Sequence, residues 1–91
     1  YAYFEWYKMF LVGNIIEVRN TNDIYINIGF DHHVNVGDVF NVYTRGRKPL
    51  LKGTATVLKH EDASSLVEFR PNTELHAIMP PKIGDLVNYK W

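Results

Sequence analysis

Hydrophobic and polar residues alternate along most of the chain with the period of two that is typical of half-buried β-strands. In residues 24–28, for example, Ile24, Ile26 and Ile28 fall on one face. Residues with β-branched and aromatic side chains are enriched in the same segments, and no window shows a long apolar stripe with helical spacing. The pattern therefore predicts six strands, at residues 13–19, 24–28, 38–44, 53–59, 65–70 and 85–89.

Clusters of turn-forming residues separate these six segments. Short strands at such spacing predict an all-β fold, a small closed or partly open barrel of about six strands. Closure of the sheet would also remove the exposed edges that an open sheet presents to other chains. We expect a single barrel domain at residues 13–91, preceded by an aromatic segment at residues 1–12.

An internal repeat relates two strand starts, because residues 36–41 (Val-Gly-Asp-Val-Phe-Asn) match residues 83–88 (Ile-Gly-Asp-Leu-Val-Asn) at an offset of 47. Upstream, the strands that begin at Gly13 and Gly53 match at an offset of 40, which leaves about seven extra residues in the second half. The repeat predicts two ββ halves related by a pseudo-twofold axis. The alternative is that both matches reflect the few ways to begin a barrel strand.

The two Gly-Asp pairs in this repeat are expected to shape turns. Gly37 and Gly84 can adopt the positive φ of a sharp turn. The carboxylates of Asp38 and Asp85 can accept backbone N–H groups that such turns leave free. We favour this structural role over a catalytic carboxylate pair, which would require the two halves to bring the aspartates together.

Composition narrows the function classes. The 91 residues carry ten Lys+Arg and ten Asp+Glu, so no global charge draws the chain to nucleic acid or to an anionic membrane. The absence of cysteine excludes disulfides, thiolate zinc sites and thiol nucleophiles. No apolar run approaches the roughly 20 residues of a membrane helix, so no membrane insertion is expected. The chain begins at Tyr1, which suggests a processed chain, an excised domain or part of a longer protein.

Residues with catalytic or metal-binding chemistry are few. Asp31-His32-His33 has the sequence of a metal-binding motif of phosphoesterases, but those enzymes need further acidic ligands from a large α/β domain. A surface metal site that adds His60 and Glu61 is the alternative to solvated turn histidines, which we favour. Neither a nucleophile elbow nor a phosphate-binding glycine loop is present. We therefore expect no catalytic residues, no bound metal and no cofactor.

A cationic hairpin is the strongest candidate for anion binding. Arg45, Arg47, Lys48 and Lys52 place four of the ten cations within eight residues, next to Tyr43. Small barrels that bind single-stranded nucleic acid combine cationic loops with stacking rings in this way. The alternative, which we favour, is a solvated hairpin whose charges keep a strand end soluble.

The N-terminal ten residues contain six of the thirteen aromatic residues. In an extended conformation the rings would lie on both faces, and a barrel core can cover only one face. We expect the other face to contact another domain, a neighbouring subunit or a second copy. A segment that folds over one end of the barrel is the alternative. The expected interaction residues are Tyr1, Tyr3, Phe4, Trp6 and Tyr7.

As an ordered set, residues 24–29, 34–43, 52–57 and 81–87 resemble the small C-terminal β-barrel of flagellar assembly protein T and related barrels of bacterial envelope proteins. The resemblance covers most of the chain, and Asp31-His32-His33 and the aromatic N-terminus depart from it. It implies a non-catalytic barrel that serves in protein assembly outside the cytoplasm.

The expected function is therefore a non-enzymatic β-barrel module that mediates protein–protein assembly, in a bacterial envelope or another multi-subunit structure. Its partners would be other proteins or further copies of the chain. Two alternatives remain. One is an accessory barrel that binds single-stranded nucleic acid through Tyr43, Arg45, Arg47 and Lys48, and the other is a structural connector of a virion.

Overall fold

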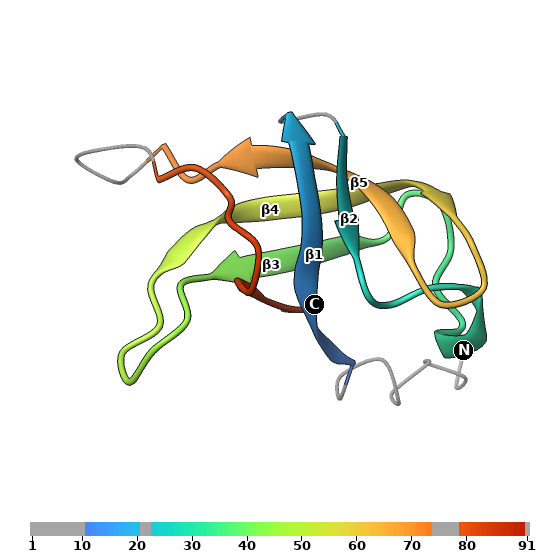
Figure 1. Cartoon of the computed structure of the whole chain (residues 1–91), viewed down its shortest axis with the longest axis horizontal. Helices are drawn as coiled ribbons and strands as arrows, with labels where there is room; N and C mark the ends of the chain where they lie inside the picture. The colour runs from blue at the N-terminus through green and yellow to red at the C-terminus, as the bar shows by residue number, and fades with distance from the viewer. Residues whose placement is uncertain (1–10, 21–22, 74–78, 91) are drawn as a thin grey trace, which may run out of the picture.

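The computed structural model describes residues 11–20, 23–73 and 79–90, which form a six-stranded barrel with one short 3-10 turn (Figure 1). All neighbouring strands are antiparallel, and the ring closes in the order β1-β2-β5-β4-β3-β6. The all-β barrel and its six strands are as the alternation predicted. The elements are β1 (Val12–Asn20), β2 (Asp23–Ile26), η2 (Phe30–His32), β3 (Val39–Tyr43), β4 (Leu51–His60), β5 (Ser65–Pro71) and β6 (Leu86–Tyr89).

The interior of the barrel is filled by alternate residues of every strand. Ile24, Ile26 and Ile28, which share a face in the sequence pattern, are all buried. Phe40 is fully buried and packs edge-to-face against Tyr89, with 5.6 Å between the two ring centroids. Because one such core touches all six strands, the described residues make one packing unit. The buried hydrophobic residues are Ile15, Ile24, Ile26, Ile28, Val34, Phe40, Val42, Ala55, Val57, Val67, Phe69 and Val87.

Strand register reveals a pseudo-twofold relation between the two halves of the chain. In the β3–β6 ladder Asn41 lies opposite Asn88, its equivalent in the repeat at offset 47, and a twofold axis through this pair exchanges Phe40↔Tyr89 with Val42↔Val87. The β2–β5 ladder on the other side of the ring is centred on Tyr25 opposite Leu66. The relation therefore exchanges β1 with β4, β2 with β5, and β3 with β6. Each half is a βββ unit, one strand longer than the ββ unit that the sequence suggested.

The first strands of the two halves align at an offset of 42 and not at the expected 40. Gly13 lies opposite Val87, and its counterpart opposite Phe40 is Ala55, not Gly53. Both strands carry a bulge at equivalent positions, after Ile15 in β1 and after Val57 in β4. The match of Gly13 to Gly53 was therefore a coincidence of residue type. The offset rises from 42 between the first strands to 47 between the last strands, so the second half has a net excess of five residues, not seven.

The two Gly-Asp turns have the same backbone geometry. Gly37 and Gly84 both have a φ of 94°. The N–H of Gly84 donates to the carbonyl of Ile15 and the N–H of Gly37 to that of Val57, each at 2.8 Å. In return the N–H groups of Ile15 and Val57 donate to the carbonyls of Asp85 and Asp38. Each turn thus fixes the strand that follows it against the bulged first strand of the other half, β6 against β1 and β3 against β4.

Among the described residues, there is no helix with the length and apolar character needed to cross a membrane.

Candidate functional site

A shallow apolar depression lies on the outer face of the barrel, over β6 and between β1 and β3. Tyr43 and Asn14 both pair with Leu86, and Val12 pairs with Asn88, so these side chains point outward on the same side of the sheet. The depression has a volume of about 250 Å³. We call it the β6 depression; it is lined by Val12, Tyr43, Pro49, Leu86, Val87 and Asn88.

Apolar side chains make up most of this surface and its border. Val12 is 64% exposed, and Leu50, the neighbour of Pro49 in the hairpin, is 54% exposed. Ligand pockets for whole small molecules usually have about 300–1,000 Å³. The β6 depression is smaller, so its size suits one apolar side chain of a partner.

Asn88 contributes an amide side chain to the lining of the depression. Its side-chain Oδ1 atom is buried and has no hydrogen-bond donor among the described residues. A buried acceptor without a donor is unusual because its lost hydration is not replaced. Asn88 thus holds an unpaired acceptor beneath a mostly apolar surface.

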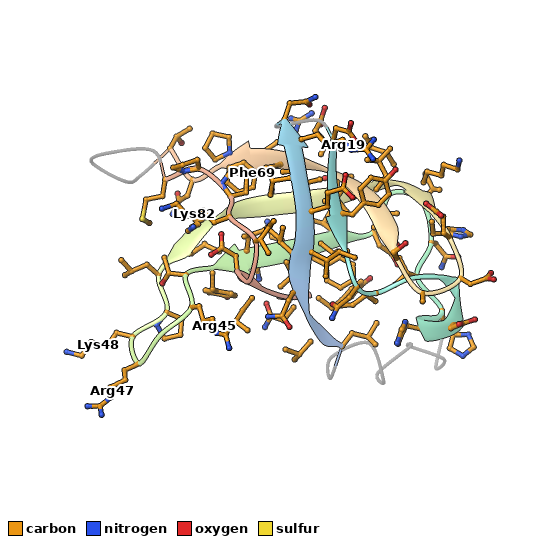
Figure 2. The ribbon with its side chains drawn as sticks, viewed as in Figure 1. Arg19, Arg45, Arg47, Lys48, Phe69 and Lys82 are labelled. Carbon is orange, nitrogen blue, oxygen red and sulfur yellow. The ribbon has the colours of Figure 1, made fainter. Side chains whose placement is uncertain are left out.

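The β3–β4 connection, residues 44–50, is a cationic loop next to the depression, and we call it the basic hairpin. The N–H of Thr44 donates to the carbonyl of Leu50 (2.9 Å), and the N–H of Leu50 donates to Thr44 Oγ1 (2.8 Å), which closes the base of the loop. Arg47 and Lys48 lie at its tip and point away from the barrel (Figure 2). Pro49 brings this loop to the rim of the depression.

Arg45, Arg47 and Lys48 are exposed and have no acidic partner within the described part of the chain. Arg45 lies nearer the barrel, with Nη1 3.6 Å from the position that a Cβ on Gly84 would occupy. The structure therefore places the predicted anion-binding residues together, with Tyr43 on the wall of the depression beside them.

Lys52 does not belong to this cationic group, contrary to the expectation from sequence. Its side chain is buried, and Nζ donates to Asp85 Oδ2 (2.6 Å) and to the carbonyl of Pro80 (3.0 Å). The same Oδ2 accepts the N–H of Lys82 at 2.7 Å. Lys52 and Asp85 therefore form a buried ion pair that joins β4 to the start of β6.

The two repeated aspartates are not brought together. Asp38 precedes the Phe40–Tyr89 end of the β3–β6 ladder, whereas Asp85 precedes its opposite end at Leu86. Asp38 Oδ2 accepts the N–H of Asn35 at 2.9 Å, in the same way that Asp85 accepts the N–H of Lys82. Both carboxylates shape their turns, which is the structural role that we favoured for them.

Asp31, His32 and His33 are exposed at the other end of the barrel, in and after η2. His32 Nδ1 accepts the N–H of Gly29 at 3.2 Å, and His33 has a φ of 60°. The N–H of Asp31 donates to the carbonyl of Asp62, so this turn does lie against the β4–β5 connection. Within residues 11–20, 23–73 and 79–90, however, no three His, Asp or Glu side chains are grouped as metal ligands.

A further cation, Arg19, is already engaged. It pairs with Glu17 and, at 3.8 Å, with Asp23, and its guanidinium lies over the Tyr25 ring. The hydrogen bond to Glu17 is the main cause that raises the pKa of Arg19. The aromatic interaction residues expected from sequence, Tyr1, Tyr3, Phe4, Trp6 and Tyr7, lie outside the described residues.

The pseudo-twofold relation supplies an internal comparison for the depression. It exchanges the surface over β6 with the equivalent surface over β3. There, a polar Thr54 and a charged Lys90 stand in place of the apolar Val12 and the aromatic Tyr43. The complete correspondence is Val12 with Thr54, Tyr43 with Lys90, Leu86 with Val39, and Asn88 with Asn41. The apolar surface is therefore a property of this sequence and not of the barrel geometry.

Sequence reasoning found Tyr43 and the hairpin cations but missed Val12, Leu86 and Asn88. A usable signal was present, because Val12 and Leu86 are apolar at positions where the alternation places outward side chains. Their pairing across β6 needed the register of three strands. Comparison with protein-family models and with curated proteins gave no match for this chain.

Proposed function

We propose that this barrel is a non-enzymatic module that binds a protein partner through the β6 depression. The observation that carries the proposal is the apolar outer surface formed by Val12, Tyr43 and Leu86, which a barrel needs neither for its core nor for its closure. Partly buried aromatic and aliphatic side chains around a small hollow are common anchoring points of protein interfaces.

We also propose that the module serves in assembly in a bacterial envelope or a similar multi-subunit structure. This part rests on the resemblance of the sequence to barrels of flagellar assembly protein T and related envelope proteins. The closed barrel is consistent with that resemblance at the level of fold. A virion connector would use the same surface.

Site-specific photocrosslinking tests the proposal. A photoreactive p-benzoylphenylalanine at position 43 is expected to yield protein adducts in cells that produce the chain. The same group at position 68 is the control, because Glu68 lies on β5, directly across the ring from β6. Equal adducts from both positions, or adducts with nucleic acid alone from position 43, would contradict the proposal.

Binding of single-stranded nucleic acid is the second candidate function, and Tyr43 beside the basic hairpin favours it. Without Lys52 the patch has three cations, which limits the log-log salt slope to about −2 on single strands. Fluorescence anisotropy with labelled oligothymidine decides the matter. Binding that Arg45→Ala with Arg47→Ala abolishes would establish this function, and no binding at tens of micromolar protein would remove it.

A further inference from the structure

We propose that the β6 depression and the basic hairpin together bind an extended acidic segment of a partner protein. One apolar side chain of that segment occupies the depression, and its carboxylates lie against Arg45, Arg47 and Lys48. The inference rests on the protein-binding function proposed above and specifies the chemistry of the partner.

The closed ring determines the mode of binding. Every strand of the described barrel has a paired neighbour on both sides, so no strand within residues 11–20, 23–73 and 79–90 offers a whole free edge for a partner segment to extend. Outward side chains are then the favoured means of recognition, and in the depression of about 250 Å³ they form a hollow. A single Phe, Leu or Ile side chain matches that size.

Charge defines the flanks of the segment. The three exposed cations of the basic hairpin have no acidic partner among the described residues. The nearby Asp85 is already paired with Lys52 at 2.6 Å. An incoming carboxylate therefore meets uncompensated positive charge next to the depression. This charge is expected to raise the association rate of an acidic partner and to favour it over other partners.

The lining of the depression favours a polypeptide over a nucleic acid. The aliphatic Val12 and Leu86 leave Tyr43 as the sole ring in the lining, which is a poor platform for successive stacked bases.

The test measures binding of a defined peptide to the intact chain. A fluorescein-labelled peptide, Gly-Asp-Glu-Asp-Phe-Asp-Glu-Asp-Gly, is titrated with protein and followed by anisotropy at about 50 mM and about 300 mM salt. We expect saturable binding that weakens at least about fivefold at the higher salt. A peptide with Asn and Gln for the acids, and one with Gly for Phe, are each expected to bind at least about tenfold more weakly.

Matched variants locate the site. Val12→Asp places a negative charge in the depression. Because this charge repels the acidic peptide, the variant is expected to lower the affinity about tenfold or more. Val36→Asp is its control, because Val36 is similarly exposed, at 62%, and lies in the turn before β3, outside the lining of the depression. Arg47→Glu with Lys48→Glu is expected to abolish binding, whereas Arg70→Glu leaves it unchanged. Circular dichroism confirms that each variant is folded.

Each other outcome rejects the proposal in a recognisable way. If the peptide does not bind but position 43 still crosslinks to protein, the acidic partner is wrong and the protein-binding function stands. If both experiments fail, both proposals fail. If oligothymidine binds more tightly than the peptide and the hairpin variants abolish that binding, the surface is a nucleic-acid site.

Discussion

The Asn88 side chain lowers the stability of the folded protein. Its Oδ1 atom is buried, without a donor in the described part of the chain, next to the aliphatic residues of the β6 depression. Asn88→Leu keeps the size of the side chain and removes the unpaired acceptor, so the free energy of unfolding is expected to rise by about 1 kcal/mol. Urea denaturation measures the change, with Asn41→Leu, the pseudo-twofold equivalent, as the control. A loss of stability in Asn88→Leu would show that its amide makes a stabilising interaction.

Substitution of the turn glycines tests the backbone conformation of the two Gly-Asp turns. Gly37 and Gly84 have a φ of 94°, a region that β-branched residues rarely adopt. No atom crowds the position of a Cβ on Gly37, so Gly37→Val would be disfavoured by backbone conformation and not by a clash. We expect Gly37→Val and Gly84→Val each to lower the free energy of unfolding by about 1–3 kcal/mol.

Urea melts compare these variants with Gly37→Asn, which tolerates positive φ better and should lose less stability. Unchanged midpoints for both valine variants would contradict the turn geometry. The positive φ of both glycines was predictable from sequence, because Gly followed by Asp before a strand has a local explanation.

At the scale of the elements, the Lys52–Asp85 pair holds the start of β6 to β4. Both side chains are buried, and removal of one partner leaves the other charge without compensation. Lys52→Met is therefore expected to destabilise the fold by about 3–5 kcal/mol. Lys52→Met combined with Asp85→Asn should recover part of that loss in thermal or urea melts. Equal losses in the single and double variants would mean that the pair is not coupled.

The strands were largely predictable, whereas the role of Lys52 was not. Alternation carries the information for each strand because one face of each is buried. Lys52 follows three nearby cations, and the local pattern groups it with them. Its actual partner, Asp85, is 33 residues away in the sequence, in the second Gly-Asp turn. The composition of the β6 depression was hidden for the same reason, since Val12, Tyr43 and Leu86 meet only when the ring closes.

At the scale of the whole molecule, the described barrel is closed without the aromatic segment before it. Deletion of residues 1–7 is therefore expected to leave the chain folded and to reduce its mass in solution, if those rings serve contacts between molecules. Multi-angle light scattering compares the intact and shortened chains. An intact chain that is already a monomer, with a protease-resistant terminus, would contradict this expectation.

The symmetric register of β3 and β6 has a consequence for valency. The surface over β3, with Val39, Asn41, Thr54 and Lys90, has the strand register of the β6 depression but neither its apolar residues nor an adjoining basic hairpin. Thr54→Val with Lys90→Tyr supplies the apolar residues without the cations, so titration with the acidic peptide is expected to give a stoichiometry of one per barrel for this variant as for the original chain. One site per barrel makes the module univalent, without the gain in avidity that two sites on one rigid body provide.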